Sequence, residues 1–166
     1  LQLAEKVDLN MLAYIPVVSS LRALLENALG EWQSSAQQHH QRIELVMEGD
    51  ISMQFDRTLM SLLLRQLLVN AIEYSPADTT ITLRVVQKKG QVVLSIEDHG
   101  CGIPQADLNR MFEKYRRATN AHLVKPDGNG LGLYIAKGIV EKCGGTIWIE
   151  SIEGSGTKIS FTLPVR

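Results

Sequence analysis

The feature that most constrains the fold is a long helical pattern of leucines in the middle of the chain. A helix is predicted from Asp56 or Thr58 to Tyr74, and the segment 75–78, which contains a proline, ends it. Its apolar residues recur every three or four positions, at Met60, Leu63, Leu64, Leu67, Leu68 and Ala71. An apolar stripe of this length has to be covered by another layer of structure.

Strands are predicted on both sides of this helix, and they cluster rather than alternate with helices. The strand-like segments are 43–47, 51–55, 79–86, 92–97, 146–151 and 158–163. Segments 79–86 and 92–97 form one predicted hairpin, and the last two segments form another. A further helix is predicted over 131–143, ended by Gly144 and Gly145. This order favours an α+β fold, a two-layer α/β sandwich with helices packed on one face of a mixed sheet, over a doubly wound sheet.

Composition narrows the class of protein. The chain has 166 residues, of which 45% are hydrophobic and 21% charged, as expected for one globular domain. The net charge of −1 argues against a nucleic-acid partner, and no apolar run is long enough to span a membrane. Cys101 and Cys143 lie far apart, which favours reduced thiols in a cytoplasmic setting. The first residues are neither an initiator methionine nor a signal peptide, so we expect a piece of a longer protein.

A line of polar residues interrupts the long helix. Gln66, Asn70 and Glu73 are spaced by four and three residues, so they share one face beside the leucine stripe. A partly covered asparagine needs a partner, which can be a backbone group, a water or a ligand. The pattern alone favours a capped or solvated helix face over a binding site.

An acidic residue follows the strand 92–97 directly. Asp98 precedes Gly100 and Gly102, an arrangement that can place a carboxylate in a cleft with the backbone close to a ligand. Such a carboxylate can accept a hydrogen bond from the amino group of a base. A simple Asp-Gly turn explains the same residues equally well.

Three glycines stand directly before the predicted helix 131–143. Gly128, Gly130 and Gly132 would allow backbone N–H groups at the helix start to approach a phosphate. Their spacing fits neither a P-loop nor a dinucleotide fingerprint, and a flexible hinge explains them equally well. The segment 154–157 is, by itself, a hairpin turn.

Taken together and in order, these segments resemble the catalytic ATP-binding domain of sensor histidine kinases. That domain belongs to a wider class, the GHKL superfamily with the Bergerat fold, which also includes gyrase, mismatch-repair ATPases and a heat-shock chaperone. The resemblance covers residue 56 to the end of the chain. The matching segments are R-Q-L-L-V-N-A-I-E-Y-S-P (65–76), D-H-G-C-G-I (98–103), F-E-K-Y-R-R-A (112–118), G-N-G-L-G-L-Y-I-A-K (128–137) and G-S-G-T (154–157).

The resemblance implies ATP and Mg²⁺ as the bound groups. It assigns the metal and the phosphates to Asn70, with Gln66 positioning metal or water on the same face, and it assigns the adenine amino group to Asp98. Arg117 of the mobile lid 112–128 would face the γ-phosphate and stabilise the transferring group. The other implied nucleotide-binding residues are Tyr74, Gly100, Gly102, Ile103 and Leu133 near the base, Gly130, Leu131 and Gly132 at the phosphates, Phe112 and Lys114 in the lid, and Thr157 assisting Asp98 through water.

Two residues depart from the family pattern. Gln66 stands where the family often has asparagine, which keeps an amide but lengthens its reach. Glu73 stands where the family usually has a basic residue that holds phosphate. An acid there repels a triphosphate unless it faces Mg²⁺ or a cation. The lid cations that can compensate are Lys114, Arg116, Arg117 and Lys125.

The family's phosphoacceptor motif is absent from this sequence. None of its histidines, His39, His40, His99 and His122, lies in an H-[ED]-x-[RK]-x-P motif. We therefore expect residues 1–41 to be a helical connector and the end of a dimerisation hairpin, and residues 42–166 to be the catalytic ATP-binding domain. The expected partners are the histidine-containing dimerisation domain and a response regulator, with this fragment monomeric and the full-length protein a homodimer.

The expected function is that of a cytoplasmic protein-histidine kinase domain in a two-component phosphorelay. It would bind Mg-ATP and transfer the γ-phosphoryl group to a histidine on a separate domain. The main alternative is a catalytically weak nucleotide-binding regulatory module, favoured by Gln66 and Glu73. An anti-sigma-type serine kinase and a mitochondrial-type protein kinase share the fold, but the long N-terminal helical region and the segment 112–118 argue against the former, and the latter is less favoured still.

Overall fold

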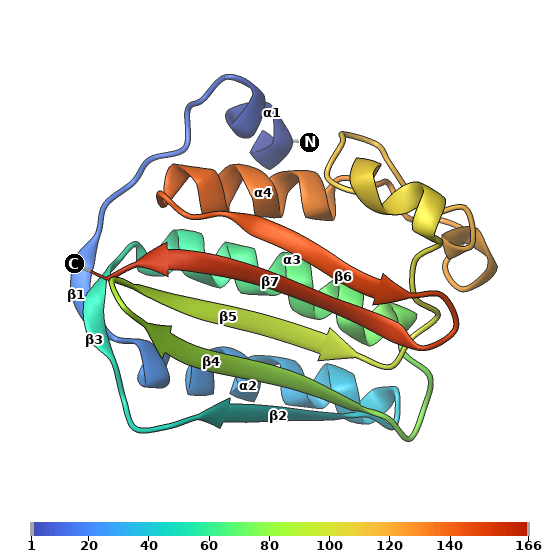
Figure 1. The fold of residues 1–166 in the computed structure, drawn as a ribbon, viewed down its shortest axis with the longest axis horizontal. Helices are drawn as coiled ribbons and strands as arrows, with labels where there is room; N and C mark the ends of the chain where they lie inside the picture. Colours follow the sequence, from blue (N-terminus) through green and yellow to red (C-terminus); the bar gives the residue numbers. More distant parts are fainter. Residues whose placement is uncertain (1, 166) are drawn as a thin grey trace.

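A mixed five-stranded sheet and the helices on one of its faces form the two layers of the molecule. The computed structural model describes residues 2–165. Across the sheet the strands are β2 (Arg42–Met47), β4 (Thr80–Lys88), β5 (Gln91–Asp98), β7 (Gly156–Pro164) and β6 (Ile147–Ile152). Strand β2 runs parallel to β4, and all other neighbours are antiparallel. Figure 1 shows the helices behind this sheet, which confirms the predicted α+β sandwich.

The central helix forms where the leucine pattern predicts it. Helix α3 (Arg57–Tyr74) begins after Asp56, whose side chain accepts a hydrogen bond from the Leu59 amide at 2.9 Å. The stripe residues Met60, Leu63, Leu64, Leu67, Leu68 and Ala71 are each at most 2% exposed. They pack against the inner face of the sheet, where Leu83, Leu94 and Phe161 are fully buried. The stripe therefore forms the centre of the core.

Two further helices flank α3. Helix α4 (Gly132–Lys142) matches the prediction and buries Ile139 and Val140. Helix α2 (Leu21–Gln38) lies in the part of the chain expected to be a connector. Its Leu21 and Leu25 are fully buried, so α2 shares the core with α3. The division of the chain into domains stays a prediction.

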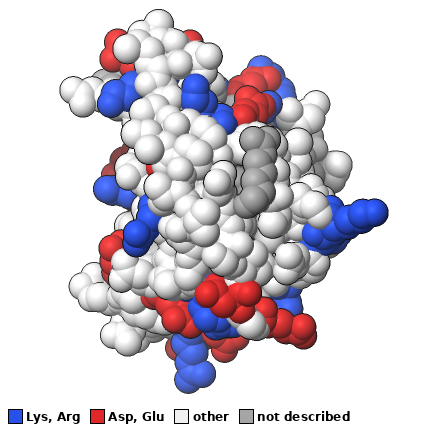
Figure 2. All heavy atoms as spheres, turned by 90° about the vertical axis from the view of Figure 1, so that its left-hand side faces the viewer, with Lys and Arg blue, Asp and Glu red and all other residues white. Residues whose placement is uncertain are grey.

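A small antiparallel sheet closes one end of the molecule. Strand β1 (Val17–Ser20) pairs with β3 (Ser52–Phe55). Strand β3 confirms the strand predicted over 51–55. Strand β1 falls within the region expected to be helical. The four residues of β1 are too short a pattern for a strand to be detected. Figure 2 shows this end: most of the charged side chains lie toward its margins, and most of the described residues between them are uncharged. The apolar side chains of Ile15 and Val18 are exposed there.

The first helix covers the outer side of α4. Helix α1 (Gln2–Asp8) buries Ala4, and Gly138 of α4 leaves room for Val7, whose Cγ1 would lie 2.4 Å from a Cβ at that position. Asp8 also accepts hydrogen bonds from Lys114 and Tyr134. Within residues 2–165, no helix combines the length and apolarity needed to cross a membrane.

The segment between β5 and α4, which contains the predicted lid 112–128, is irregular. It contains the short 3-10 helices η1 (Gln105–Arg110) and η2 (Ala121–Leu123). The buried carboxylate of Asp107 accepts bonds from the backbone N–H and the hydroxyl of Thr119, both at 2.9 Å, and these bonds lower the pKa of Asp107. A single carboxylate thereby ties the two halves of the region together.

Candidate functional site

A cavity of about 320 Å³ lies between α3, the end of β5, the start of β7 and the lid. This volume is in the range of small-molecule sites. The structure brings most of the sequence-predicted residues into its lining: Gln66, Asn70, Tyr74, Asp98, Gly102, Ile103, Arg117, Gly130, Gly132, Leu133 and Thr157. The cavity thus combines residues from segments that are far apart in the sequence.

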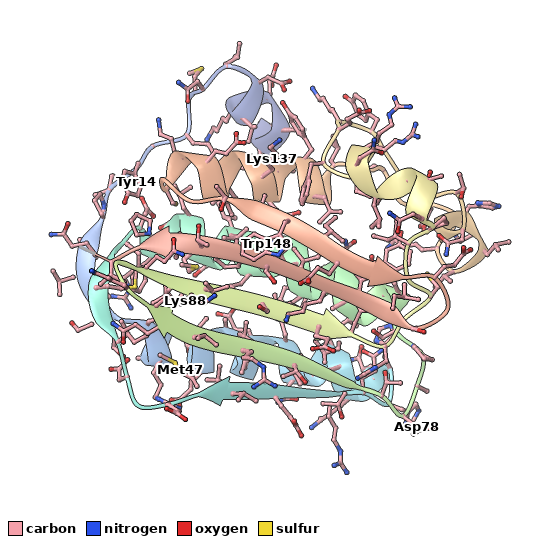
Figure 3. All side chains as sticks on the ribbon, in the orientation of Figure 1. Tyr14, Met47, Asp78, Lys88, Lys137 and Trp148 are labelled. Atoms are coloured by element: carbon pink, nitrogen blue, oxygen red, sulfur yellow. The ribbon has the colours of Figure 1, made fainter. Side chains whose placement is uncertain are left out.

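Four predicted residues lie outside the lining. Gly100 is directly behind it, where an added Cβ would lie 2.3 Å from the Tyr74 carbonyl oxygen. Leu131 is buried just before α4. Phe112 packs on the core, and Lys137, labelled on α4 in Figure 3, lies 6.0 Å from its ring centroid. Lys114 is 2.5 Å from Asp8 of α1 rather than at the cavity.

Asp98 occupies the end of β5 in the cavity wall. Its Oδ1 accepts hydrogen bonds from the backbone N–H groups of Gly100 at 2.9 Å and Thr157 at 3.2 Å. Burial raises the pKa of Asp98 to about 6, although both hydrogen bonds act in the opposite direction. Asp98 and Thr157 are therefore in direct contact through the Thr157 backbone, whereas the sequence suggested a contact through water.

A serine that the sequence gave no reason to select supports this wall. The hydroxyl of Ser151 on β6 accepts a bond from the Ile103 amide at 2.9 Å and lies 2.9 Å from the Thr157 hydroxyl. It also donates to the Gly156 carbonyl at 2.7 Å. One hydroxyl thus connects the loop after β5 with the turn before β7. Its role depends on the contact between the loop after β5 and β6, which joins residues 48 positions apart and which no local pattern reveals.

The polar face of α3 forms another part of the lining. Gln66, Asn70 and Glu73 all line the cavity, as their spacing predicts. Their side chains present amide and carboxylate oxygens, which suit a hard cation such as Mg²⁺. Within the described residues there is no group of three or more His, Cys, Asp or Glu able to hold a metal.

The three glycines before α4 serve different purposes. A Cβ at Gly128 would lie 2.9 Å from the Arg117 guanidinium, so this glycine makes room for the lid arginine. Gly130 has a φ of +70° and packs on the Tyr115 and Arg116 backbone. Gly132 begins α4, and the nearest atom to a Cβ there is Gln66 Oε1 at 3.7 Å. Only the third glycine leaves open space toward the polar face of α3.

Charged side chains tie the lid to the last turn of α3. Lys125 forms an ion pair with Glu73, and this pair raises the pKa of Lys125. Arg117 donates to the Tyr74 hydroxyl at 3.0 Å, to the Pro126 carbonyl at 3.3 Å and to the Lys125 carbonyl. The sequence indicated that Glu73 needs a facing cation, and the structure identifies it as Lys125.

The sheet, the helical layer and the cavity between them define an ATPase-type domain, and sequence comparison agrees. Residues 55–166 match the model of the family described as histidine kinase-, DNA gyrase B- and HSP90-like ATPase. This match covers more than half of the chain, so the chain belongs to that family.

Relatives within the family are named as sensor kinases. The chain is 34% identical over 140 residues to the sensor histidine kinase WalK of Bacillus subtilis, a match that covers 83% of this chain and 23% of that protein. It is 37% identical over 113 residues to the sensor protein kinase WalK of Staphylococcus aureus, covering 67% of this chain and 27% of that one. The chain therefore spans about a quarter of the length of these relatives.

Solved structures show the same fold. The Acinetobacter baumannii histidine kinase AdeS superposes with a TM-score of 0.81 at 22% identity, covering 99% of this chain and 75% of that one. The catalytic domain of histidine kinase ThkA gives 0.77 at 24% identity, covering 93% and 97%. Full-length ShkA in complex with AMPPNP gives 0.85 at 20% identity, covering 98% and 34%.

Proposed function

We propose that this chain binds Mg-ATP in the cavity and transfers the γ-phosphoryl group to a histidine on a separate dimerisation domain, as the catalytic half of a sensor histidine kinase. The observation that carries the proposal is Asp98, an acid that two backbone amides hold in the wall of the cavity that the polar face of α3 also lines. The family membership and the names of the relatives support the same function.

Asp98 would recognise the base. An ionised carboxylate accepts a hydrogen bond from the adenine amino group, and such charge-assisted bonds are among the strong ones. The apolar side chains of Ile103 and Leu133 line the same cavity and would pack on the ring. Tyr74 lies beside them in the lining. Guanine carries a carbonyl where adenine carries the amino group, so the carboxylate would reject it.

Another part of the lining would hold the phosphates. Gly130 and Gly132 lie at the start of α4, where unpaired N–H groups and the helix dipole favour an anion. Asn70 and Gln66 would present oxygens to Mg²⁺, which neutralises phosphate charge when it is bound. In this account the described residues supply position and charge, and little covalent chemistry.

Transfer would move one phosphoryl group between two partners. The imidazole nitrogen of the acceptor histidine forms a bond to the γ-phosphorus as the bond from that phosphorus to the β,γ-bridging oxygen breaks. ADP leaves, and the imidazole releases its proton. Arg117 would stabilise the charge on the transferring group after exchanging its bonds to Tyr74 and the lid carbonyls for the nucleotide. A response regulator would then receive the group in the cytoplasm.

A second candidate function is a nucleotide-binding regulatory module without phosphoryl transfer. The observation that favours it is Glu73, an acid on the cavity wall where phosphates would lie. The two candidates share the base end of the cavity, which is the part around Asp98. They differ at the phosphate end, which is the part around Asn70 and the start of α4. Transfer of labelled phosphate from ATP to a histidine-bearing dimerisation domain supplied in trans separates them, because only the kinase labels the domain.

Calorimetric titration with Mg-ATP tests the binding step. The unaltered chain should bind, and Asp98→Asn should weaken binding about 10- to 100-fold, the effect of losing a hydrogen bond to a charged group. Glu97→Gln is the matched control, because Glu97 is the adjacent acid and is exposed. Equal affinity in Asp98→Asn and the unaltered chain, or no binding by the unaltered chain, would contradict the proposal.

A further inference from the structure

The charges that line the cavity cancel. Three cationic side chains, Arg116, Arg117 and Lys125, face three acidic ones, Glu73, Asp98 and Asp127. A triphosphate is a strong polyanion, so it gains little from a lining without net charge. At least one cation must therefore change partners when such a ligand enters.

The three cations differ in what holds them. The Nη2 atom of Arg116 lies 4.0 Å from Oδ1 of Asp107, and Asp107 is not part of α3. Arg117 donates to the Tyr74 hydroxyl and to backbone carbonyls, which are neutral acceptors. Lys125 is the cation paired with an acid of α3 itself, Glu73, which is one turn beyond Asn70. Lys125 is thus held beside the amide proposed to meet the metal and the phosphates.

The pair is placed so that it can exchange. The side chains of Lys125 and Glu73 are 30% and 29% exposed, so water and ligands reach both. A lysine ammonium carries three donors on a flexible stem, and it can turn to a new anion without movement of the backbone. A phosphate polyanion in the cavity attracts that ammonium more strongly than a single carboxylate does.

We propose that Lys125 is the phosphate-binding cation of this site, and that Glu73 holds it in the empty cavity until a nucleotide displaces it. The proposal rests on the proposed function. It assigns Glu73 a definite role: this acid sets the position of Lys125 beside the phosphates, and it lowers the affinity for any ligand that has to break the pair. A nucleoside without phosphates leaves the pair intact.

The decisive comparison is between Glu73→Gln and the double variant Glu73→Gln/Lys125→Gln. Both lack the acid, so any difference between them reports what Lys125 itself does to a ligand. If Lys125 binds phosphate, the double variant binds Mg-ATP about tenfold more weakly than Glu73→Gln, while adenosine binds both equally. Glu73→Gln alone should bind Mg-ATP severalfold more tightly than the unaltered chain, because no pair has to break.

Two controls keep the test interpretable. Lys137→Gln removes a lysine that pairs with Glu141 on the surface of α4 at 3.7 Å, and it should leave Mg-ATP affinity unchanged. Adenosine affinity in each variant reports that the base end is folded.

Equal Mg-ATP affinity in Glu73→Gln and the double variant would overturn the role of Lys125. If Asp98→Asn still weakened Mg-ATP binding as predicted in that case, the proposed function would stand without this inference. Failure of the unaltered chain to bind Mg-ATP would overturn both.

Discussion

The base end and the phosphate end of the cavity are built in different ways. At the base end, Asp98 and Thr157 lie on neighbouring strands, and backbone hydrogen bonds fix them. At the phosphate end, the lid meets α3 through the side chains of Lys125, Glu73 and Arg117. Backbone pairing over a buried core changes only when the fold changes, whereas partly exposed ion pairs exchange partners easily. Under the proposed function, one wall of the cavity would therefore select the ligand, and the other could respond to it.

The largest difference should appear in stability when a leucine is truncated in each region. Leu64 of α3 is fully buried, so Leu64→Ala should lower the free energy of unfolding by about 2–5 kcal/mol. Leu123 of the lid is 78% exposed, so Leu123→Ala should change it by less than about 0.5 kcal/mol. Urea denaturation measures both. Similar losses in the two variants would mean that the lid belongs to the same cooperative core as α3. The proposed difference between the two regions would then be wrong.

The next effect concerns a glycine that lines the base end. Gly102 and Gly90 both have positive φ, +67° and +76°, so alanine strains the backbone at each. A Cβ at Gly102 would also lie 2.1 Å from the Ile152 carbonyl oxygen, whereas nothing lies within 4 Å at Gly90. Gly102→Ala should therefore be about 1–3 kcal/mol more destabilising than Gly90→Ala. It should also weaken adenosine binding, and equal costs at the two positions would argue against a rigid base end.

The third effect is a pH dependence confined to the base end. Burial raises the pKa of Asp98 from 3.8 to about 6, so its ionised form dominates only above pH 6. Adenosine affinity should therefore fall about tenfold from pH 7 to pH 5, as the carboxylate gains a proton. Asp98→Asn should remove this dependence. If adenosine affinity depended on pH in the same way in the unaltered chain and in Asp98→Asn, a group other than Asp98 would be responsible for the pH dependence.

The same shift has a consequence for the stability of the empty protein. Because the folded state holds the Asp98 proton up to about pH 6 and the unfolded state releases it near 3.8, the folded state binds more protons between these values. The Asp98 contribution to the free energy of unfolding therefore decreases as pH rises through this interval. The Asp98 contribution is measured as the free energy of unfolding of the unaltered chain minus that of Asp98→Asn, at each pH. If this difference increased with pH, the raised pKa of Asp98 would be contradicted.

The smallest effect is expected where α1 meets the lid. Asp8→Asn removes the ionic bond to Lys114 and weakens the bond to Tyr134. Because this contact is a surface ion pair, the midpoint of global unfolding should not change measurably. Hydrogen exchange of the α1 amides should become severalfold faster, since local opening needs fewer contacts to break. Unchanged exchange would show that Val7 and Ala4 alone hold the helix in place.

The elements that local patterns encode were predictable. The leucine spacing of α3 and the two hairpins depend on residues close together in the sequence, so periodicity and turn chemistry identify them. The shared face of Gln66, Asn70 and Glu73 follows from helix geometry in the same way. The resemblance to a family added the link between these segments.

What the sequence could not reveal depends on long-range contacts. The pairing of Lys125 with Glu73 joins residues 52 positions apart, and that of Lys114 with Asp8 joins residues 106 apart. The resemblance implied Lys114 as a nucleotide-binding residue and named Lys125 only among the compensating cations, although Lys114 lies at α1 and Lys125 at the cavity. Only the packed chain determines which cation meets which acid.

The central claim is that one cavity binds the base at Asp98 and the phosphates at the start of α4. An amide NMR titration of the ¹⁵N-labelled chain tests it most directly. Adenosine should shift the amides of Gly100 and Thr157 and leave Gly132 unmoved, whereas Mg-ATP should shift all three. Shifts from Mg-ATP confined to another surface, or shifts at Gly132 from adenosine alone, would contradict the account.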